Sequence, residues 1–134
     1  MRLEGAIPHE AMAFFVLRDS ALRAQYTSGP AATVLRNIEV AYGTGLIGWV
    51  AENWTPIING NPSVEPGWPP AEVDVLRSAL VVPLASYDGM RGILGLYRVE
   101  REAFSSADLV RLVGECQRVG SGSWKPEYSD IRVA

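Results

Sequence analysis

The residue types that most often carry out chemistry are scarce in this chain, which contains one cysteine, Cys116, and one histidine, His9. A Ser-His-Asp triad or a Cys-His pair would have to use His9. A zinc site made of cysteine and histidine needs about four such ligands, so one chain cannot build it. A single cysteine also cannot form a disulfide within the chain, which suits a reducing cytoplasm. We therefore predict a protein that is not an enzyme.

Both residues have simple structural interpretations. Cys116 falls among apolar residues with helical spacing, where a small buried side chain is expected in preference to a redox centre. His9 precedes the first predicted strand, where we expect an isolated surface residue and not a ligand.

Three glycines, Gly43, Gly45 and Gly48, have the G-x-G-x-x-G spacing of dinucleotide-binding turns, and Glu65 lies about twenty residues further on. In that motif a pyrophosphate binds at a helix N-terminus. Here the helix must stop before Pro56, which is too early for a crossover between parallel strands. Glu65 also lies in a proline-rich loop and not at a strand end. We therefore interpret the glycines as a tight turn that lets the helix pack close to the sheet.

Composition narrows the class of protein further. The 134 residues are 48% hydrophobic and 20% charged, which predicts one domain with a packed core. The net charge of -3 gives no basic surface for nucleic acid. The N-terminus lacks a signal peptide, and the apolar run over residues 11–17 is far below the ~20 residues of a membrane helix. We expect a cytoplasmic domain that binds neither nucleic acid nor membrane.

Apolar runs and alternation predict the strands that would position a site. They fall at residues 11–18, 21–28, 37–42, 57–59, 79–86 and 91–99. Within 21–28, Leu22, Ala24 and Tyr26 share one face of the strand.

The connections between these strands favour antiparallel pairing. Residues 19–20 and 88–89 have the short polar sequences of hairpin turns. Pro83 indicates an edge or a bulge, because proline cannot donate to a sheet ladder. The predicted fold is α+β, with a central antiparallel sheet of five to six strands flanked by helices.

Two helices and one long loop complete the prediction. Residues 45–54 form a short helix with Leu46, Trp49, Val50 and Trp54 near one face. The last helix starts at Ser105 or Ser106, and its apolar stripe consists of Leu109, Leu112, Val113, Cys116 and Val119. Residues 60–72 hold four of the nine prolines, which is typical of a lid or binding loop.

Five segments in chain order resemble the signatures of GAF domains, which are PAS-like sensory and regulatory domains common in bacterial signalling proteins. The segments are 43–52 (GTGLIGWVAE), 56–59 (PIIN), 76–84 (LRSALVVPL), 92–97 (GILGLY) and 104–109 (FSSADL). The resemblance implies a GAF/PAS-like fold. It also implies a pocket for a small molecule under the central helix and the long loop, and a signal passed to an attached or partner output domain.

The sequence departs from several defined GAF branches. Bilin-binding members use a cysteine, commonly beside a histidine, whereas Cys116 and His9 lie far apart. The free methionine sulfoxide reductases of this fold need more than one cysteine. Cyclic-nucleotide binders have an asparagine–lysine and phenylalanine–aspartate–glutamate motif that is missing here, and haem would depend on His9. The sequence thus argues against bilin, haem and zinc and identifies no cofactor.

The resemblance yields an expected function, domain layout and pocket. We expect a non-catalytic sensory or regulatory domain that binds an unidentified small molecule, forms a homodimer, or does both; the alternative is a ligand-free dimerisation module. Residues 1–10 are a lead-in, 11–120 the GAF-like domain and 121–134 a tail, so the chain is a fragment of a longer protein or lacks the family's leading helix. The predicted pocket residues are Leu46, Trp49, Val50, Asn61, Trp68, Arg77 and Tyr97.

Each pocket residue also has a purely structural explanation. Core packing is favoured for Trp49, and Trp68 is either a lid over the pocket or an anchor for its loop. Asn61 is expected to form a turn and Arg77 a surface ion pair, with ligand contact as the alternative for both.

Overall fold

A single antiparallel sheet organises the computed structural model, which describes residues 7–29, 32–68, 76–86, 90–118 and 124–125. Its strands are β1 (Ala11–Arg18), β2 (Ala21–Ser28), β3 (Glu39–Ala41), β4 (Ile57–Gly60), β5 (Ser78–Ser86), β6 (Arg91–Arg98) and β7 (Trp124–Lys125). The helices are α1 (Ala32–Asn37), α2 (Gly45–Asn53) and α3 (Ser106–Arg118), with a 3₁₀ turn, η1 (Pro62–Val64).

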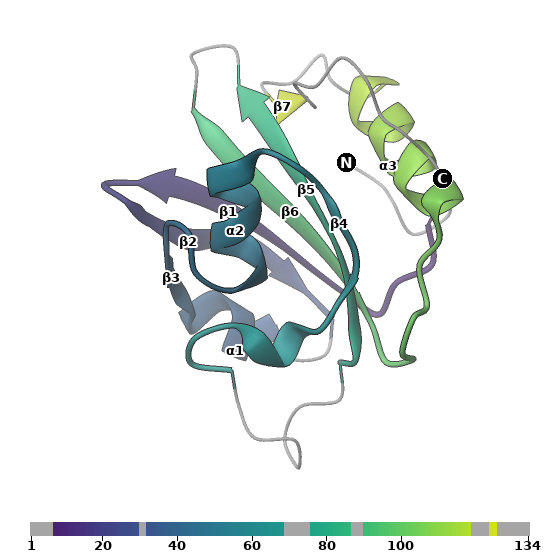
Figure 1. The fold of residues 1–134 in the computed structure, drawn as a ribbon, viewed down its shortest axis with the longest axis horizontal. Helices are drawn as coiled ribbons and strands as arrows, with labels where there is room; N and C mark the ends of the chain where they lie inside the picture. Colours follow the sequence, from purple (N-terminus) through teal and green to yellow (C-terminus); the bar gives the residue numbers. More distant parts are fainter. Residues whose placement is uncertain (1–6, 30–31, 69–75, 87–89, 119–123, 126–134) are drawn as a thin grey trace.

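The strands run in the order β3-β2-β1-β6-β5-β4, and β7 pairs with β5 (Figure 1). Every described pair of strands is antiparallel. The predicted α+β fold is therefore confirmed, and the short strand β7 lies in the segment that we expected to be a tail.

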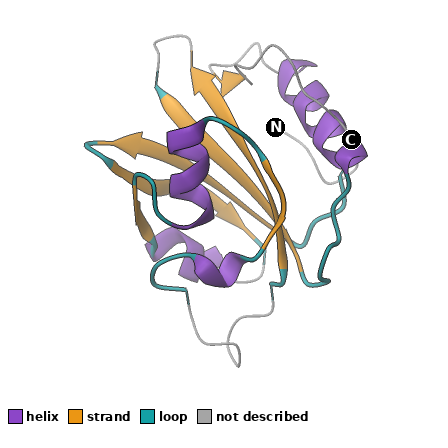
Figure 2. Cartoon of the chain, viewed as in Figure 1, coloured by secondary structure: helices purple, strands orange, loops and turns teal. Residues whose placement is uncertain are grey.

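Helices cover the two faces of the sheet and create two cores (Figure 2). α1 and α2 pack on one face, in what we term the α2-side core, and α3 packs on the other, the α3-side core. Successive residues of a strand point to opposite faces, so β6 sends Ile93 and Tyr97 into the α2-side core and Leu94 and Leu96 into the α3-side core. This double burial explains the continuous apolar sequences of β5 and β6.

The hairpin between β1 and β2 has the predicted two-residue turn. Asp19 and Ser20 both have left-handed backbones, with φ of 54° and 69°. Positive φ at both central residues is the requirement of a type I′ turn, which matches the twist of the flanking strands. The second predicted turn, residues 88–89, lies outside the described residues, although the strands on either side of it pair as expected.

A bulge corrects the predicted face of β2. Phe14 pairs with Tyr26 but Phe15 pairs with Ala24, so Gln25 is an extra residue on β2. Leu22 and Ala24 therefore face the α2-side core, whereas Tyr26 is 53% exposed. The regular alternation that we predicted over the whole strand is wrong beyond Ala24.

Pro83 lies where β5 has no neighbour on its outer side. The β4 ladder reaches only Val81, and the β7 ladder begins at Ala85. Pro83 pairs with Ile93 of β6 on the other side. Its missing N–H therefore costs no ladder bond, as the prediction of an edge position requires.

Helix α2 begins after a tight glycine turn, as predicted. Gly43 and Gly45 have φ of 88° and 64°, and a Cβ at Gly48 would collide with the Ala41 carbonyl oxygen. The buried residues of α2 are Ile47, Gly48, Val50 and Ala51. Trp49 points away from them and is 40% exposed, so the core packing predicted for it is wrong.

Helix α3 has the predicted start and buried stripe. Ser105 Oγ accepts from Asp108 N at 3.2 Å, and Asp108 Oδ2 accepts from Ser105 N at 2.9 Å, which makes a reciprocal cap. Leu109, Leu112 and Cys116 are all buried in the α3-side core. Val119, the last residue of the predicted stripe, lies outside the described residues.

Residues of the predicted lead-in also take part in the fold. Ile7 is buried in the α3-side core, and Glu10 accepts from Val99 N at 2.8 Å. Domain boundaries at residues 10 and 120 stay predictions. Within the part of the chain that the structure describes, no helix is long and apolar enough to cross a membrane.

Candidate ligand site

Small residues on the sheet make space for one large side chain, Tyr97. In the sheet register, Tyr97 on β6 lies between Ala11 on β1 and Ala79 on β5. Two residues earlier on the same face is Gly95, where a Cβ would lie 2.7 Å from the Tyr97 hydroxyl oxygen. The missing side chain at Gly95 therefore lets the hydroxyl lie over the middle of the sheet.

Trp68 packs on the same face of the sheet, against Tyr97. The Trp68 and Tyr97 ring centroids are 6.1 Å apart with a tilt of 32°, a favourable separation for an aromatic pair. Trp68 is partly buried against the α2-side core, as is Leu46 in the first turn of α2. The described part of the long loop, residues 60–68, thus lies next to the start of α2 (Figure 1).

Glu65 joins this loop to α2. Its Oε1 accepts from Leu46 N at 3.1 Å and its Oε2 accepts from Ile47 N at 3.2 Å. These amides belong to the first turn of the helix, where N–H groups have no partner within the helix. The preceding residue, Thr44, makes no side-chain cap, so the carboxylate of Glu65 takes over that role from the loop.

Gly45 provides the room for this carboxylate. A Cβ at Gly45 would collide with Glu65 Oε1, and its φ of 64° is one that other residues rarely adopt. The glycine that completes the dinucleotide-like spacing is therefore needed to admit an acid from the protein itself.

Burial changes the acidity of both ionisable groups at the site. Glu65 is only 4% exposed, and burial raises its pKa to about 7, although the two N–H bonds act in the opposite direction. The pKa of Tyr97 is also raised, first by burial and then by the negative charge of Glu65. The carboxylate and the phenol are thus close enough to interact electrostatically.

Two buried donors at the site have no acceptor. Neither the Tyr97 hydroxyl nor Trp68 Nε1 has a hydrogen-bond partner among the described residues. Leaving such a group unsatisfied in a protein interior costs about 1–3 kcal/mol. The protein therefore carries one N–H group and one O–H group, on neighbouring aromatic rings, that a bound acceptor could satisfy.

The structure brings together only part of the predicted pocket set. Trp68 and Tyr97 meet at the site, Leu46 donates its N–H to Glu65, and Val50 is buried in the α2-side core. Trp49 lies on the outer side of α2 and is 40% exposed.

Two polar members of the set have local partners. Asn61 accepts from Ser63 N at 3.0 Å and caps η1, which is the turn role that the sequence favoured. Arg77 donates to the neighbouring Leu76 carbonyl at 3.2 Å. Ligand binding by the predicted set stays a prediction.

Sequence reasoning missed Glu65 as a site residue. It stands in no motif of paired carboxylates, and its partners on α2 are 18 and 19 residues away in the chain. The sole signal was its distance from the glycine motif, which we set aside because Glu65 lies in a proline-rich loop and not at a strand end.

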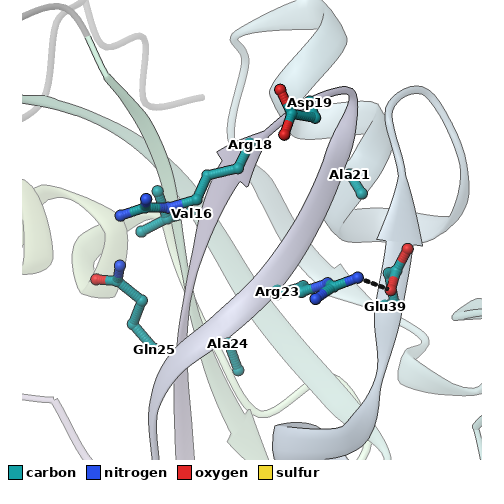
Figure 3. Close-up of a pocket in the computed structure, with 8 residues that line it drawn as sticks. All are labelled: Val16, Arg18, Asp19, Ala21, Arg23, Ala24, Gln25 and Glu39. Atoms are coloured by element: carbon teal, nitrogen blue, oxygen red, sulfur yellow. Dashed lines mark ion pairs between the residues drawn. The ribbon is translucent and has the colours of Figure 1, made fainter.

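A hollow lies along the β1–β2 hairpin (Figure 3). Its volume is about 440 Å³, and it is lined by Val16, Arg18, Asp19, Ala21, Arg23, Ala24, Gln25 and Glu39. Arg23 pairs with Glu39 at 2.7 Å, and both side chains are more than half exposed. Its charged groups are solvated and partly neutralise one another, so this hollow is a weaker candidate than the site around Tyr97.

Cysteine, histidine and acidic side chains do not gather into a group of three or more that could hold a metal ion, as far as the described residues go. The burial of Cys116 raises the pKa of its thiol to about 12, with a further contribution from the nearby charge of Glu115.

Comparison with models of known protein families identifies the family of this chain. The family model of the GAF domain matches residues 3–115. This chain belongs to the GAF domain family. GAF domains are a sensory and regulatory family found in signalling proteins. No curated protein matches the chain in sequence.

Solved structures of GAF domains have the same fold as this one. The GAF domain of a phosphoenolpyruvate-protein phosphotransferase from Coxiella burnetii is 20% identical, with a TM-score of 0.65 over 90% of this chain and 80% of that one. The GAF domain of a two-component sensor histidine kinase from Bacillus halodurans is 15% identical, with a TM-score of 0.65 over 89% and 84%. The free methionine sulfoxide reductase of Staphylococcus aureus, solved with its substrate, is 16% identical, with a TM-score of 0.69 over 89% and 75%.

Proposed function

We propose that this GAF domain is a non-catalytic sensor that binds a small molecule between the sheet face around Tyr97 and the segment formed by η1 and Trp68. The observation that carries the proposal is the pair of buried donors, Tyr97 Oη and Trp68 Nε1, that lack partners among the described residues. A bound acceptor would offset their desolvation.

The same geometry supports a way for binding to alter the protein. A ligand held by Trp68 would restrain the loop, and Glu65 connects that loop to the first turn of α2. At the other end of α2, Arg91 of β6 donates to the Ala51 carbonyl at 3.1 Å. Ligand binding would therefore shift the population of loop and helix positions relative to the sheet.

The chemistry of Cys116 supports a non-catalytic role. Enzymes occur on this fold, as the methionine sulfoxide reductases demonstrate. The reactive form of cysteine is the thiolate, and reactive cysteines are accessible and have lowered pKa values. Cys116 is buried, and that burial raises its pKa to about 12.

The test is a search for ligand in freshly purified protein by native mass spectrometry, followed by thermal-shift screening of small molecules. We expect either a ligand mass that stays with the protein or a compound that stabilises the protein against heat. We expect Tyr97→Phe to weaken the binding of that ligand. The matched control is Tyr26→Phe, because Tyr26 is 53% exposed and distant in register from the site. The sensor proposal would be refuted if mass spectrometry detected only ligand-free chains and no screened compound changed the thermal stability of the protein.

The second candidate is a ligand-free dimerisation module. The observation that favours it is the packing of Trp68 against Tyr97, because the two rings themselves fill space that a ligand would need. Light scattering over a range of concentrations tests it, with a concentration-dependent homodimer and no ligand as the expected result. In either case we expect the domain to act in the cytoplasm through an attached or partner output domain.

A further inference from the structure

The N-terminus of α2 is already occupied by a carboxyl group of the protein itself, which carries a negative charge whenever Glu65 is ionised. Helix N-termini favour anions, because their free N–H groups and the helix dipole both point toward the ligand. In this nine-residue helix the two amides in reach of the site, Leu46 N and Ile47 N, are both taken by Glu65. A ligand carboxylate or phosphate would have to displace Glu65 or bind beside it.

Binding beside Glu65 would be costly. Glu65 is 4% exposed, and two negative charges close together in a region that excludes water repel each other strongly. Glu65 itself fills the room that Gly45 leaves beside the helix N-terminus, since a Cβ at Gly45 would collide with Glu65. The site is therefore built against anionic ligands.

The two unpartnered groups indicate which chemistry the site accepts. Indole Nε1 is only a donor, and the Tyr97 hydroxyl has its proton free of any described acceptor. Both belong to aromatic rings whose centroids are 6.1 Å apart. Rings in this arrangement offer flat apolar surface, and small residues at Ala11 and Ala79 border the floor.

We propose that the ligand is a small uncharged planar molecule whose carbonyl oxygen or ring nitrogen accepts from Tyr97 Oη–H and Trp68 Nε1–H, and that Glu65 is the residue that excludes anions. This inference rests on the proposed sensor function and specifies the chemistry of its ligand. A cation would be attracted to Glu65, but it would leave both donors unsatisfied.

Three probes with one skeleton and different charges test the ligand class: benzamide, benzoate and benzylamine. Titrations by calorimetry or ligand-observed NMR at pH 8.5 keep Glu65 ionised, because its pKa is about 7. We expect benzamide to bind and both charged probes to bind at least about tenfold more weakly. Equal or tighter binding of benzoate or benzylamine overturns the inference and leaves the sensor proposal standing.

Single substitutions test the two donors. Tyr97→Phe and Trp68→Phe should each weaken benzamide binding about fivefold, the effect of losing one hydrogen bond. Tyr26→Phe and Trp49→Phe are the matched controls, because both parent residues are exposed. Unchanged benzamide affinity in Tyr97→Phe and Trp68→Phe would contradict the proposal.

Two measurements test the role of Glu65. Glu65→Gln removes the charge and should raise benzoate affinity to within about threefold of benzamide affinity. If that variant does not fold, the wild-type protein provides the second test, because protonation of Glu65 below pH 7 should strengthen benzoate binding while benzamide binding stays constant. Failure of all three probes overturns the ligand class, whereas the sensor proposal is decided separately by the mass spectrometry of purified protein.

Discussion

The two faces of the sheet have the same strands but different kinds of interior. The α3-side core consists of aliphatic side chains, Phe104 and the buried thiol of Cys116, closed by a helix with a reciprocal cap. The α2-side interior holds a carboxylate with a raised pKa and two donors without described partners. The comparison indicates that both faces pack apolar side chains, but that the α2-side core also carries polar groups whose burial costs stability, as the proposed binding role would require.

The largest expected effect is on the purely apolar α3-side core. Leu112 is fully buried in the α3-side core, so Leu112→Ala should lower the free energy of unfolding by about 2–5 kcal/mol. Urea denaturation followed by circular dichroism measures this. Val110→Ala on the same helix is the control, since Val110 is 47% exposed and should change stability by less than about 0.5 kcal/mol. Similar losses in both variants would contradict the assignment of the core.

The second-largest expected effect is a pH dependence of the free energy of unfolding that comes from Glu65 in the α2-side core. Folding raises the Glu65 pKa from 4.5 to about 7, so the folded state holds the proton more tightly than the unfolded state. The resulting stability is fully present below pH 4.5 and is lost as pH rises to about 7, by up to about 3 kcal/mol. Other carboxyl groups titrate in the same range, so the measured quantity is the difference between wild type and Glu65→Gln. A difference that does not change between pH 5 and pH 8 would show that Glu65 is not buried as described.

The third effect tests the space beside the carboxylate. Gly45→Ala introduces a Cβ at a φ of 64° and against Glu65, so it should destabilise the protein by about 2 kcal/mol. The matched control is Gly114→Ala in α3, where a Cβ meets open space and alanine is the better helix former. Thermal unfolding of the two variants should change in opposite directions.

The smallest expected effect has the opposite sign to the first. Tyr97→Phe removes a buried hydroxyl without a described partner, so it should raise the free energy of unfolding by about 1 kcal/mol while weakening ligand binding. Denaturation of the ligand-free protein measures this. A loss of more than about 1 kcal/mol would mean that the hydroxyl already has an acceptor in the free protein.

Local patterns predicted the parts of the fold that depend on neighbours in the sequence. The turn at Asp19 and Ser20 and the capped, striped helix α3 are examples, because a few adjacent residues determine each of them. Apolar runs and alternation predicted the order of the strands, and the GAF signatures then predicted the type of fold. Prediction was wrong where one residue breaks a period, as at Gln25, whose bulge turns Tyr26 out to solvent.

The candidate site was harder to predict, because its contacts join distant segments. Trp68 and Tyr97 were identified, yet what each would meet depends on how the loop returns over the sheet. Trp49 was placed in the core because helical spacing alone does not say which side of a short apolar helix faces the sheet. Glu65 escaped notice because a single acid in a loop has no periodicity and binds backbone amides, which every residue possesses.

The contact between Glu65 and the start of α2 has an evolutionary consequence. If the proposed ligand class is right, the choice between charged and uncharged ligands depends on one codon. A single nucleotide change turns a glutamate codon into one for glutamine, which keeps an acceptor oxygen but loses the charge, or into one for glycine or lysine, neither of which can accept from the amides of Leu46 and Ile47. A descendant of this domain could therefore acquire an anionic signal molecule in one mutational step, with the glycine turn that such a ligand needs already in place.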